Sequence, residues 1–269
     1  MSFSALARKY HLYPSRNYGQ NFLLSLAPIK KMIAAADLQP SDVIIEIGPG
    51  FGALTFALAG KVKKVIAFEI EKKLEPYWEE KLKEQPNIEI IWGNVLKKFG
   101  EGMGEVYKVI ANIPYHITSD ILRLFLEAEH KPERLVLMVQ KEVAKRICAK
   151  PPDMSLLSVA VQYYGQPKFV TAVPRGSFWP APKVDSAIVA ISLKHPSTST
   201  SQQDRQFFRV VKAGFSHKRK QLWRNLSTQL HLAPLNVKAV ILKVVGSETV
   251  RAEELGVEEW KQITDKISN

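Results

Sequence analysis

The feature that most constrains the fold is a glycine-rich turn between an apolar segment and an amphipathic one. Val43–Ile47 is apolar apart from Glu46, and the turn Gly48–Gly52 (GPGFG) follows it directly. A helical pattern then covers Ala53–Ala59. A strand–turn–helix unit of this kind lets the backbone approach a ligand closely and offers the free N–H groups of a helix N-terminus. We therefore expect a nucleotide-type site at the end of a buried strand.

Strand-like and helix-like segments alternate through the first two thirds of the chain. The predicted strands are Val43–Ile47, Val65–Phe68, Ile88–Ile91, Tyr107–Ala111 and Leu135–Val139, and the predicted helices are Ala53–Ala59, Lys72–Glu84, Ser119–Ala128 and Lys141–Ala149. Continuously apolar strands are typical of a parallel sheet covered on both faces. A helix at Ser155–Tyr163 and two strands, Pro167–Val173 and Ser186–Leu193, would extend that sheet. The fold class predicted is α/β.

A change in composition indicates a second domain. Residues 194–203 (KHPSTSTSQQ) are polar and lack periodicity, which is typical of a linker. Only helical patterns follow, at Arg205–Ala213, Lys218–Leu230, Leu235–Val244 and Val257–Ile267. We place a boundary near residue 196, which gives a domain at 1–196 and a small, all-helical domain at 197–269.

Charge and cysteine content limit the class of protein. Lys and Arg exceed Asp and Glu by 38 − 26 = 12, and this excess favours a polyanionic partner such as nucleic acid or an acidic membrane surface. Cys148 is the only cysteine, which excludes an internal disulfide and suits the cytoplasm. The histidines lack metal-ligand spacing, so no metal is predicted. The apolar run from Val43 to Gly60 contains Glu46 and Pro49 and is not a membrane span.

An acidic residue follows the glycine turn at a spacing used by nucleotide sites. Glu69 ends the second predicted strand, 69 − 52 = 17 residues after Gly52, where a carboxylate can accept hydrogen bonds from both ribose hydroxyls. The turn also satisfies the dinucleotide pattern, so an NAD enzyme is one alternative. A purely structural glycine turn with a solvated Glu69 is another.

The motif Asn112-Ile113-Pro114-Tyr115 distinguishes between these cofactors. It follows the fourth predicted strand, and Pro114 fixes its own φ and keeps Ile113 out of the helical region, which makes the backbone a rigid shelf. An exocyclic aromatic amine is a poor nucleophile because its lone pair is delocalised into the ring. The Asn112 side-chain oxygen and a shelf carbonyl could hold both N–H groups out of the ring plane and direct the lone pair at an electrophilic methyl group. Tyr115 is placed to stack on the base.

Together these motifs resemble the KsgA (RsmA) family of small-subunit rRNA adenine N6-dimethyltransferases. The matching stretches run nearly from end to end: Gly19–Leu23, Glu46–Gly52, Glu69, Asn112–Tyr115, Gln140–Val143, Ser158–Tyr164, Phe178–Ser186 and the basic C-terminal helix. The resemblance implies a Rossmann-like S-adenosylmethionine methyltransferase sheet with helices on both faces and a small helical domain. It also implies transfer of methyl groups to the N6 amines of two adjacent adenosines in 16S-type rRNA of the pre-30S particle, by a monomer.

The resemblance assigns roles to particular residues of this sequence. Asn21 and Leu23 would line the cofactor site, Gly48 and Gly50 would lie against the cofactor, and Glu69 would hold its ribose.

At the reacting end, Asn112 would sit where cofactor and target amine meet, on the shelf stiffened by Pro114. Phe178 would form a second aromatic face opposite Tyr115, with the flipped adenine between them.

The chain departs from the family pattern at two positions and in one loop. Gly93-Asn94-Val95 stands where the family has Gly-Asp-Ala, and Asn94 would accept from the adenine amine of the cofactor without the charge of an Asp. His116 follows Tyr115 where a small polar residue is expected. The segment around Lys150–Ser155 is shorter than in the family.

Cations in the second domain are expected to bind RNA. Lys218-Arg219-Lys220 packs three like charges together, and a phosphate backbone would relieve that repulsion. The candidate RNA-binding residues are Arg205, Lys212, Lys218, Arg219, Lys220 and Arg224. The aromatic residues between them, which include Phe207 and Trp223, are expected to pack in the core.

Several alternatives remain open at this point. One is a large-subunit adenine methyltransferase of the macrolide-resistance type, which shares the Asn-Ile-Pro-Tyr motif, although the segment Phe215–Leu226 is more similar to the small-subunit family. DNA-adenine and protein-glutamine methyltransferases would not explain the match at Phe178–Ser186. A non-catalytic ribosome-assembly or organellar transcription factor derived from the family is a further alternative.

Overall fold

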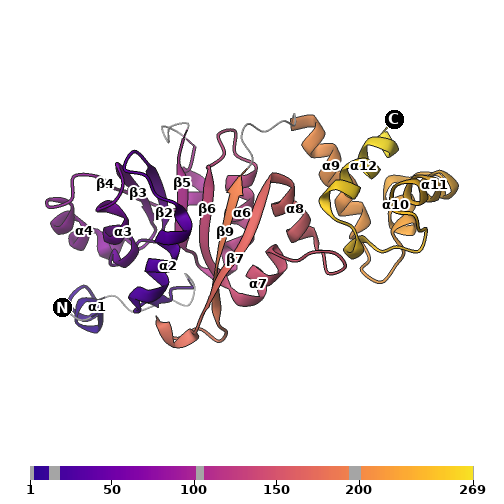
Figure 1. Cartoon of the computed structure of the whole chain (residues 1–269). Coiled ribbons are helices and arrows are strands. Elements are labelled where there is room, and N and C mark those ends of the chain that lie inside the picture. Colours follow the sequence, from indigo (N-terminus) through magenta and orange to yellow (C-terminus); the bar gives the residue numbers. More distant parts are fainter. Residues whose placement is uncertain (1–2, 12–18, 101–105, 194–200, 269) are drawn as a thin grey trace. The chain divides into compact units, whose positions relative to one another are not determined.

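The structure is a computed structural model that describes residues 3–11, 19–100, 106–193 and 201–268 (Figure 1). The chain divides into two compact units. The first, which we call the sheet unit, comprises Met1–Ala144 and Pro167–Leu193, and the second, the helical unit, comprises Lys145–Gln166 and Lys194–Asn269.

The sheet unit is built on a seven-stranded sheet with the order β4-β3-β2-β5-β6-β9-β7 (Figure 1). Its strands are β2 (Val43–Ile47), β3 (Lys64–Glu69), β4 (Ile88–Trp92), β5 (Lys108–Asn112), β6 (Arg134–Gln140), β7 (Gly165–Val173) and β9 (Ser186–Leu193). The pairs among β2 to β6 are parallel, and β9 runs antiparallel to β6. The returning strands predicted from the sequence therefore extend a mostly parallel sheet, which confirms the α/β class.

Helices precede, connect and follow the parallel strands. They are α2 (Leu26–Ala36), α3 (Ala53–Ala59), η1 (Lys72–Leu74), α4 (Glu75–Leu82), α5 (Val95–Lys98), η2 (Tyr115–Ile117), α6 (Thr118–Leu126) and α7 (Lys141–Ile147), after an N-terminal α1 (Phe3–Lys9). Helix α2 was not predicted.

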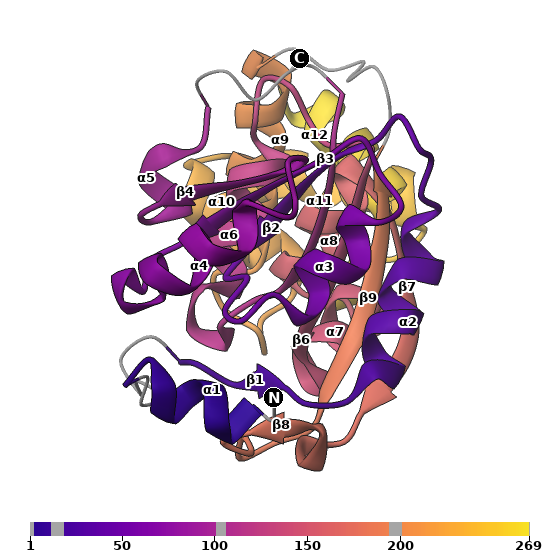
Figure 2. The ribbon, with the colours of Figure 1, turned by 90° about the vertical axis from the view of Figure 1, so that its left-hand side faces the viewer.

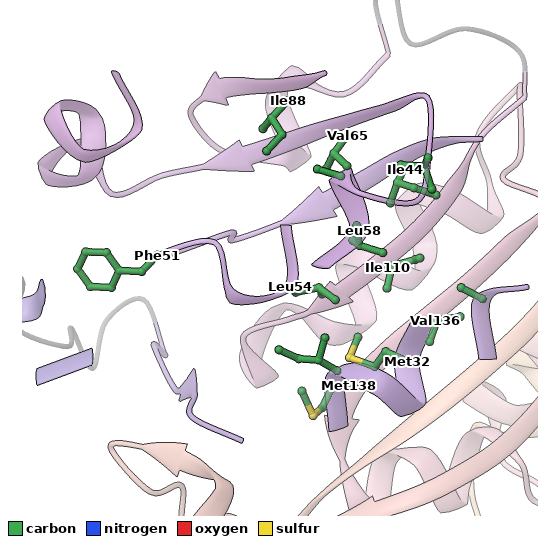
Figure 3. Packing of buried hydrophobic residues seen from close by; sticks show 14 of the residues in the cluster. Met32, Ile44, Phe51, Leu54, Leu58, Val65, Ile88, Ile110, Val136 and Met138 are labelled. Atoms are coloured by element: carbon green, nitrogen blue, oxygen red, sulfur yellow. The ribbon is translucent and has the colours of Figure 1, made fainter. Parts of the chain in front are cut away.

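Alternate residues of the strands pack against helices on opposite faces of the sheet. On one face, Leu54 and Leu58 of α3 lie over Ile44 and Val65, while Met32 of α2 lies beside Met138 (Figure 3). On the other face, α6 and the residue that follows α5 pack against the sheet. There the ring of Phe99 lies 6.5 Å from Phe68 of β3 and 4.8 Å from Phe125 of α6. Two covered faces explain why these strands are apolar throughout.

A short antiparallel ribbon joins two segments that are far apart in the sequence. Strand β1 (Phe22–Leu23) pairs with β8 (Phe178–Trp179), with Phe22 opposite Trp179 and Leu23 opposite Phe178 (Figure 2). The Leu24 N–H extends the pairing by donating to the Ser177 carbonyl at 2.8 Å. The ribbon therefore fixes the N-terminal segment that precedes α2.

The helical unit consists of α8 (Leu156–Tyr164), α9 (Ser201–Gly214), α10 (Leu222–Leu230), α11 (Pro234–Val245), η4 (Ala252–Glu254) and α12 (Val257–Ser268). Its core contains Phe207, Leu226, Ile241 and Trp260, all nearly inaccessible to solvent. Helix α9 begins at Ser201, inside the polar segment that we interpreted as a linker, and residues 194–200 lie outside the described residues.

The division into units differs from the boundary expected near residue 196. Helix α8, which we assigned to the first domain, packs with the C-terminal helices because its inner residues complete their core. Val159 is fully buried in that core, and the Tyr163 ring stacks on Phe207 at 4.1 Å. The sequence places α8 before strand β7, so the helical unit takes one helix from between two strands of the sheet.

Replacing Gly214 with alanine should destabilise the helical unit. A Cβ at Gly214 would clash with Trp260 Cη2 and lie 2.9 Å from Leu222 Cδ1, and both side chains are buried. Overpacking of this kind costs about 1–3 kcal/mol. Urea unfolding of Gly214→Ala measures the loss. In the control Gly60→Ala, no atom lies within 4 Å of the new Cβ, so stability should be unchanged or slightly higher.

No helix among the described residues is long and apolar enough to span a membrane.

Candidate active site

A cleft lies at the carboxyl ends of three adjacent strands, β3, β2 and β5. The space between its walls totals about 900 Å³, a figure that includes open solvent at its mouth. Ligand clefts of open α/β sheets occur at this edge. The predicted site residues that line the cleft are Asn21, Leu23, Gly48, Gly50, Glu69, Asn112, Pro114 and Tyr115.

The glycine turn forms the floor of the cleft in a conformation that other residues rarely adopt. Gly48 has a φ of +69° and Gly50 a φ of +56°. A Cβ at Gly48 would meet no protein atom within 4 Å, so it would project into open space, whereas a Cβ at Gly50 would lie 3.0 Å from the Phe22 ring. The turn therefore leaves room for a ligand at Gly48 and packs tightly at Gly50.

Two aromatic side chains of α4 support the turn from below. The Trp78 indole N–H donates to the Gly50 carbonyl at 3.0 Å, and the Tyr77 hydroxyl donates to the Phe51 carbonyl at 2.9 Å. Trp78 is fully buried. Because both carbonyls are held from below, the turn keeps its shape without a ligand.

Glu69 is anchored by backbone groups on both sides. Its Oε2 accepts from the Gly50 N–H at 3.0 Å and its Oε1 from the Glu71 N–H at 2.8 Å. Burial raises the pKa of Glu69, and these backbone hydrogen bonds lower it in part. A carboxylate has about four acceptor sites, so two remain for hydroxyl donors in the cleft.

The Asn112 amide is oriented by a backbone carbonyl that lies 91 positions earlier in the chain. Its Nδ2 donates to the Asn21 carbonyl at 3.0 Å. A carbonyl can only accept, so the amino end of the amide must face Asn21 and the oxygen, Oδ1, is the acceptor that remains. The Asn21 side chain in turn donates to the Gly19 carbonyl at 3.2 Å.

Hydrogen bonds also hold the shelf after Asn112. The Pro114 carbonyl accepts from the Ile117 N–H at 3.2 Å, and the Tyr115 carbonyl accepts from the Thr118 hydroxyl at 3.0 Å. The Tyr115 hydroxyl lies 2.6 Å from the Oγ of the buried Ser186, which fixes the ring. Burial raises the pKa of Tyr115, so it is a neutral phenol near pH 7.

His116, for which the sequence offered no explanation, lies against the N-terminal segment. A Cβ at Gly19 would be 2.9 Å from His116 Nδ1, and Gly19 has a φ of +58°. The exposed His116 ring therefore fills the space beside a glycine, next to the cleft but outside its wall.

Two predicted site residues do not line the cleft. Phe178 is only 3% exposed and lies in the hydrophobic core, paired opposite Leu23 in the β1–β8 ribbon. Asn94 caps α5, and its Oδ1 accepts from the Leu96 N–H at 3.0 Å. The roles that the resemblance assigns to these two residues thus stay predictions.

Glu46 also lines the cleft, although the sequence analysis gave it no role in the site. Glu46 lies on β2 between the other two strands of the cleft and is only 2% exposed. Its Oε2 is buried and has no hydrogen-bond partner among the described residues. In the sequence, the signal for a role of Glu46 was its position as a charged residue inside an otherwise apolar strand.

The predicted RNA-binding cations are all exposed on the helical unit: Arg205, Lys212, Lys218, Arg219, Lys220 and Arg224. Lys218 forms a loose ion pair with Glu253 at 3.8 Å. Asp204, the acid among these cations, accepts instead from the hydroxyl groups of Tyr163 and Tyr164. Phe207 is buried as expected.

A comparison with protein families matches this architecture over nearly the whole chain. The model described as "Ribosomal RNA adenine dimethylase" matches residues 14–268. The chain belongs to this family. Membership confirms the enzyme class predicted from the sequence, an S-adenosylmethionine-dependent rRNA adenine dimethyltransferase.

Individual members agree with this assignment. A protein of Dehalococcoides mccartyi (strain CBDB1), "Ribosomal RNA small subunit methyltransferase A", is 44% identical over 94% of this chain and 88% of its own length. Among solved structures, a dimethyladenosine transferase from Plasmodium falciparum is 28% identical with a TM-score of 0.77, covering 90% of this chain and 95% of its own. The 23S rRNA methyltransferase ErmE is 27% identical with the same TM-score, covering 93% of this chain and all of its own. These structures confirm the methyltransferase sheet with a C-terminal helical region.

Proposed function

We propose that this protein dimethylates the N6 amines of two adjacent adenosines in small-subunit rRNA. S-adenosylmethionine is the methyl donor. The observation that carries the proposal is the Asn112 amide, which lines the cleft and whose amino group is held by the Asn21 carbonyl, so that its oxygen is the acceptor that remains. The small subunit is preferred because the curated relative with 44% identity is named for it, whereas the large-subunit enzyme ErmE is 27% identical.

The cleft residues fit S-adenosylmethionine. The open space over Gly48 accepts a group pressed against the backbone, and the remaining acceptor sites of Glu69 suit the two ribose hydroxyls. Asn21 and Leu23 close the opposite wall. When bound, this cofactor supplies an electrophilic methyl group on a sulfonium. We place its adenosine toward Glu69 on β3 and its methyl group toward Asn112 on β5.

Asn112 and the shelf activate the target amine. The Pro114 and Tyr115 carbonyls already accept hydrogen bonds, so we assign the second acceptor role to Ile113, which also lines the cleft. Asn112 Oδ1 and the Ile113 carbonyl then hold the two N–H groups out of the ring plane. The positive charge that develops on the nitrogen is stabilised by both oxygens, and no strong base is required.

Tyr115 provides the surface on which the flipped adenine stacks. Its hydroxyl bond to Ser186 prevents the ring from rotating, which reduces the entropy lost on binding. Flipping the base out of its stack costs a few kcal/mol of unstacking free energy, and stacking on one aromatic ring contributes a similar favourable free energy. We keep the proposal that Phe178 supplies the opposite face, which requires the β1–β8 ribbon to move.

The exposed cations of the helical unit are proposed to bind rRNA phosphates of the pre-30S particle. The unit holds them on its surface while Phe207 and Trp260 form its core. We further propose that the protein acts as a monomer in the cytoplasm, where the small subunit is assembled.

Methyl transfer to purified subunits tests the proposal directly. The protein is incubated with labelled S-adenosylmethionine and either small or large subunits that lack N6-methyladenosine. We expect label on adenosines of the small-subunit rRNA only, as dimethyladenosine. Label on the large subunit would identify the macrolide-resistance type instead. Cofactor binding without transfer to either subunit, or no binding at all, would favour an assembly factor.

Loss of two cations should weaken subunit binding and its salt dependence. Arg219→Gln with Lys220→Gln removes two proposed phosphate contacts, so the slope of log K against log salt should fall by about 1–2. Filter binding to small subunits at several salt concentrations measures it. The matched control is Lys243→Gln with Lys266→Gln, which changes two exposed cations of α11 and α12. Equal slopes for both double variants would contradict the assignment.

A further inference from the structure

A buried carboxyl group without a partner lies in the middle of the cleft. Glu46 is on β2, between β3, which carries Glu69, and β5, which carries Asn112. Its Oε2 is inaccessible to solvent and accepts no hydrogen bond from any described residue. Neither does the buried Thr55 hydroxyl on α3 bond to it with acceptable geometry. An ionised carboxylate in this state would be strongly destabilised.

The charged surroundings of Glu46 add to this penalty. The charged side chain that faces it is Glu69, whose negative charge favours the neutral form. Helix α3 (ALTFALA) carries no charged residue, and Asn112 and Asn21 contribute amides. Burial raises the pKa of Glu46 to about 8, with a smaller contribution from Glu69, while the proximity of the Thr55 hydroxyl dipole lowers it in part.

We propose that Glu46 is protonated when the cleft lacks cofactor and loses that proton to solvent when the α-ammonium group of S-adenosylmethionine binds beside it. The inference rests on the proposed function for the identity of the ligand. A cation at the part of Glu46 that borders the cleft supplies the opposite charge that this buried carboxyl group lacks, and the resulting ion pair favours the charged carboxylate. The ligand loses no atom in this step, and the proton passes from Glu46 to the buffer.

The ammonium group is the fitting cation for a geometric reason. A ligand with its ribose at Glu69 and its methyl group at Asn112 crosses the end of β2, where Glu46 lies. Its methyl-bearing sulfur must point toward the target amine, so the amino-acid part is free to lie against Gly48 and Glu46. Glu69 is less suited to a cation because two backbone N–H groups already bind its carboxylate.

Proton release on binding is the direct test. Calorimetric titration of the protein with S-adenosylmethionine at pH 7, in buffers of different ionisation enthalpy, gives the number of protons released per site. With the Glu46 pKa at about 8, we expect between about one half and one proton. The affinity should rise up to about tenfold per pH unit between pH 6 and 7.5, since only the ionised form of Glu46 binds and the greater part of the ligand keeps a charged ammonium there.

Ligand analogues identify the cation. S-adenosylhomocysteine keeps the ammonium group and lacks the sulfonium, so it should release the same number of protons. 5′-Methylthioadenosine lacks both and should release none. Release with S-adenosylmethionine alone, or with all three ligands, would overturn the assignment to the ammonium group.

Variants separate Glu46 from other titrating groups. Glu46→Gln should bind the cofactor more weakly, with no proton release and no pH dependence between pH 6 and 7.5. His116→Asn, in which a titratable ring beside the cleft is removed, should release as many protons as the wild type. If the wild type binds without proton release, or Glu46→Gln releases as much as the wild type, the inference fails and the proposed function stands. If the wild type does not bind S-adenosylmethionine, the proposed function itself fails.

Discussion

Replacing Asn112 with alanine should reduce methylation of small subunits at least about a hundredfold while S-adenosylmethionine still binds. Only the Asn112 oxygen can accept from the target amine at this position, because the amide is fixed by the Asn21 carbonyl. Loss of one such preorganised polar group typically costs about 10²–10³ in kcat. Single-turnover transfer of labelled methyl groups measures the rate, and calorimetry measures cofactor binding.

Two further variants make this prediction specific. Asn112→Asp keeps an acceptor oxygen and loses the N–H that binds Asn21, so its rate should fall between those of the wild type and Asn112→Ala. Asn87→Ala removes an amide that donates to the Ala59 and Val62 carbonyls, away from the cleft, so it should lower stability without changing kcat. Wild-type transfer by Asn112→Ala would remove this residue from the mechanism.

Replacing Glu69 with alanine should weaken S-adenosylmethionine binding about a hundredfold or more. The carboxylate is proposed to accept both ribose hydroxyls, and hydrogen bonds to a charged group contribute about 1.5–3 kcal/mol each. The variant also leaves the Gly50 and Glu71 N–H groups without their acceptor, which loosens the glycine turn. Calorimetry or equilibrium dialysis measures the dissociation constant.

The control for Glu69 is a neighbouring acid with a local role. Glu71 caps η1 by accepting from the Lys73 N–H at 3.3 Å and does not line the cleft. Glu71→Gln keeps an acceptor oxygen, so cofactor binding should stay within a factor of about two or three of the wild type. A similar loss in both variants would indicate a general electrostatic effect of negative charge near the cleft.

Residues that depend on local pattern could be predicted from the sequence. The glycine turn, Glu69 and Asn112 each follow an apolar strand, and the carboxyl ends of adjacent parallel strands lie along one edge of the sheet. The strand Val43–Ile47 and the helix Ala53–Ala59 agree with the structure residue for residue.

Features that depend on contacts between distant segments could not be predicted. The strands β1 and β8 have two residues each, too few for a periodic pattern, so neither their pairing nor the burial of Phe178 was visible. The acceptor for Asn112 is a backbone carbonyl, which leaves no trace in residue type. The cap at Asn94 was accessible in principle, because Asn is a favoured residue before a helix.

The Asn21 carbonyl has a consequence for redesign of this kind of enzyme. Because a main-chain atom from the N-terminal segment locks the reactive amide, the four residues Asn112–Tyr115 are an incomplete module when transplanted alone. A scaffold given only that tetrapeptide would carry an amide that swivels between two orientations and presents its oxygen only part of the time. A graft of the tetrapeptide should therefore also include a backbone carbonyl that accepts from the amide. A truncated chain without residues 19–23 should keep its folded sheet but lose catalytic activity.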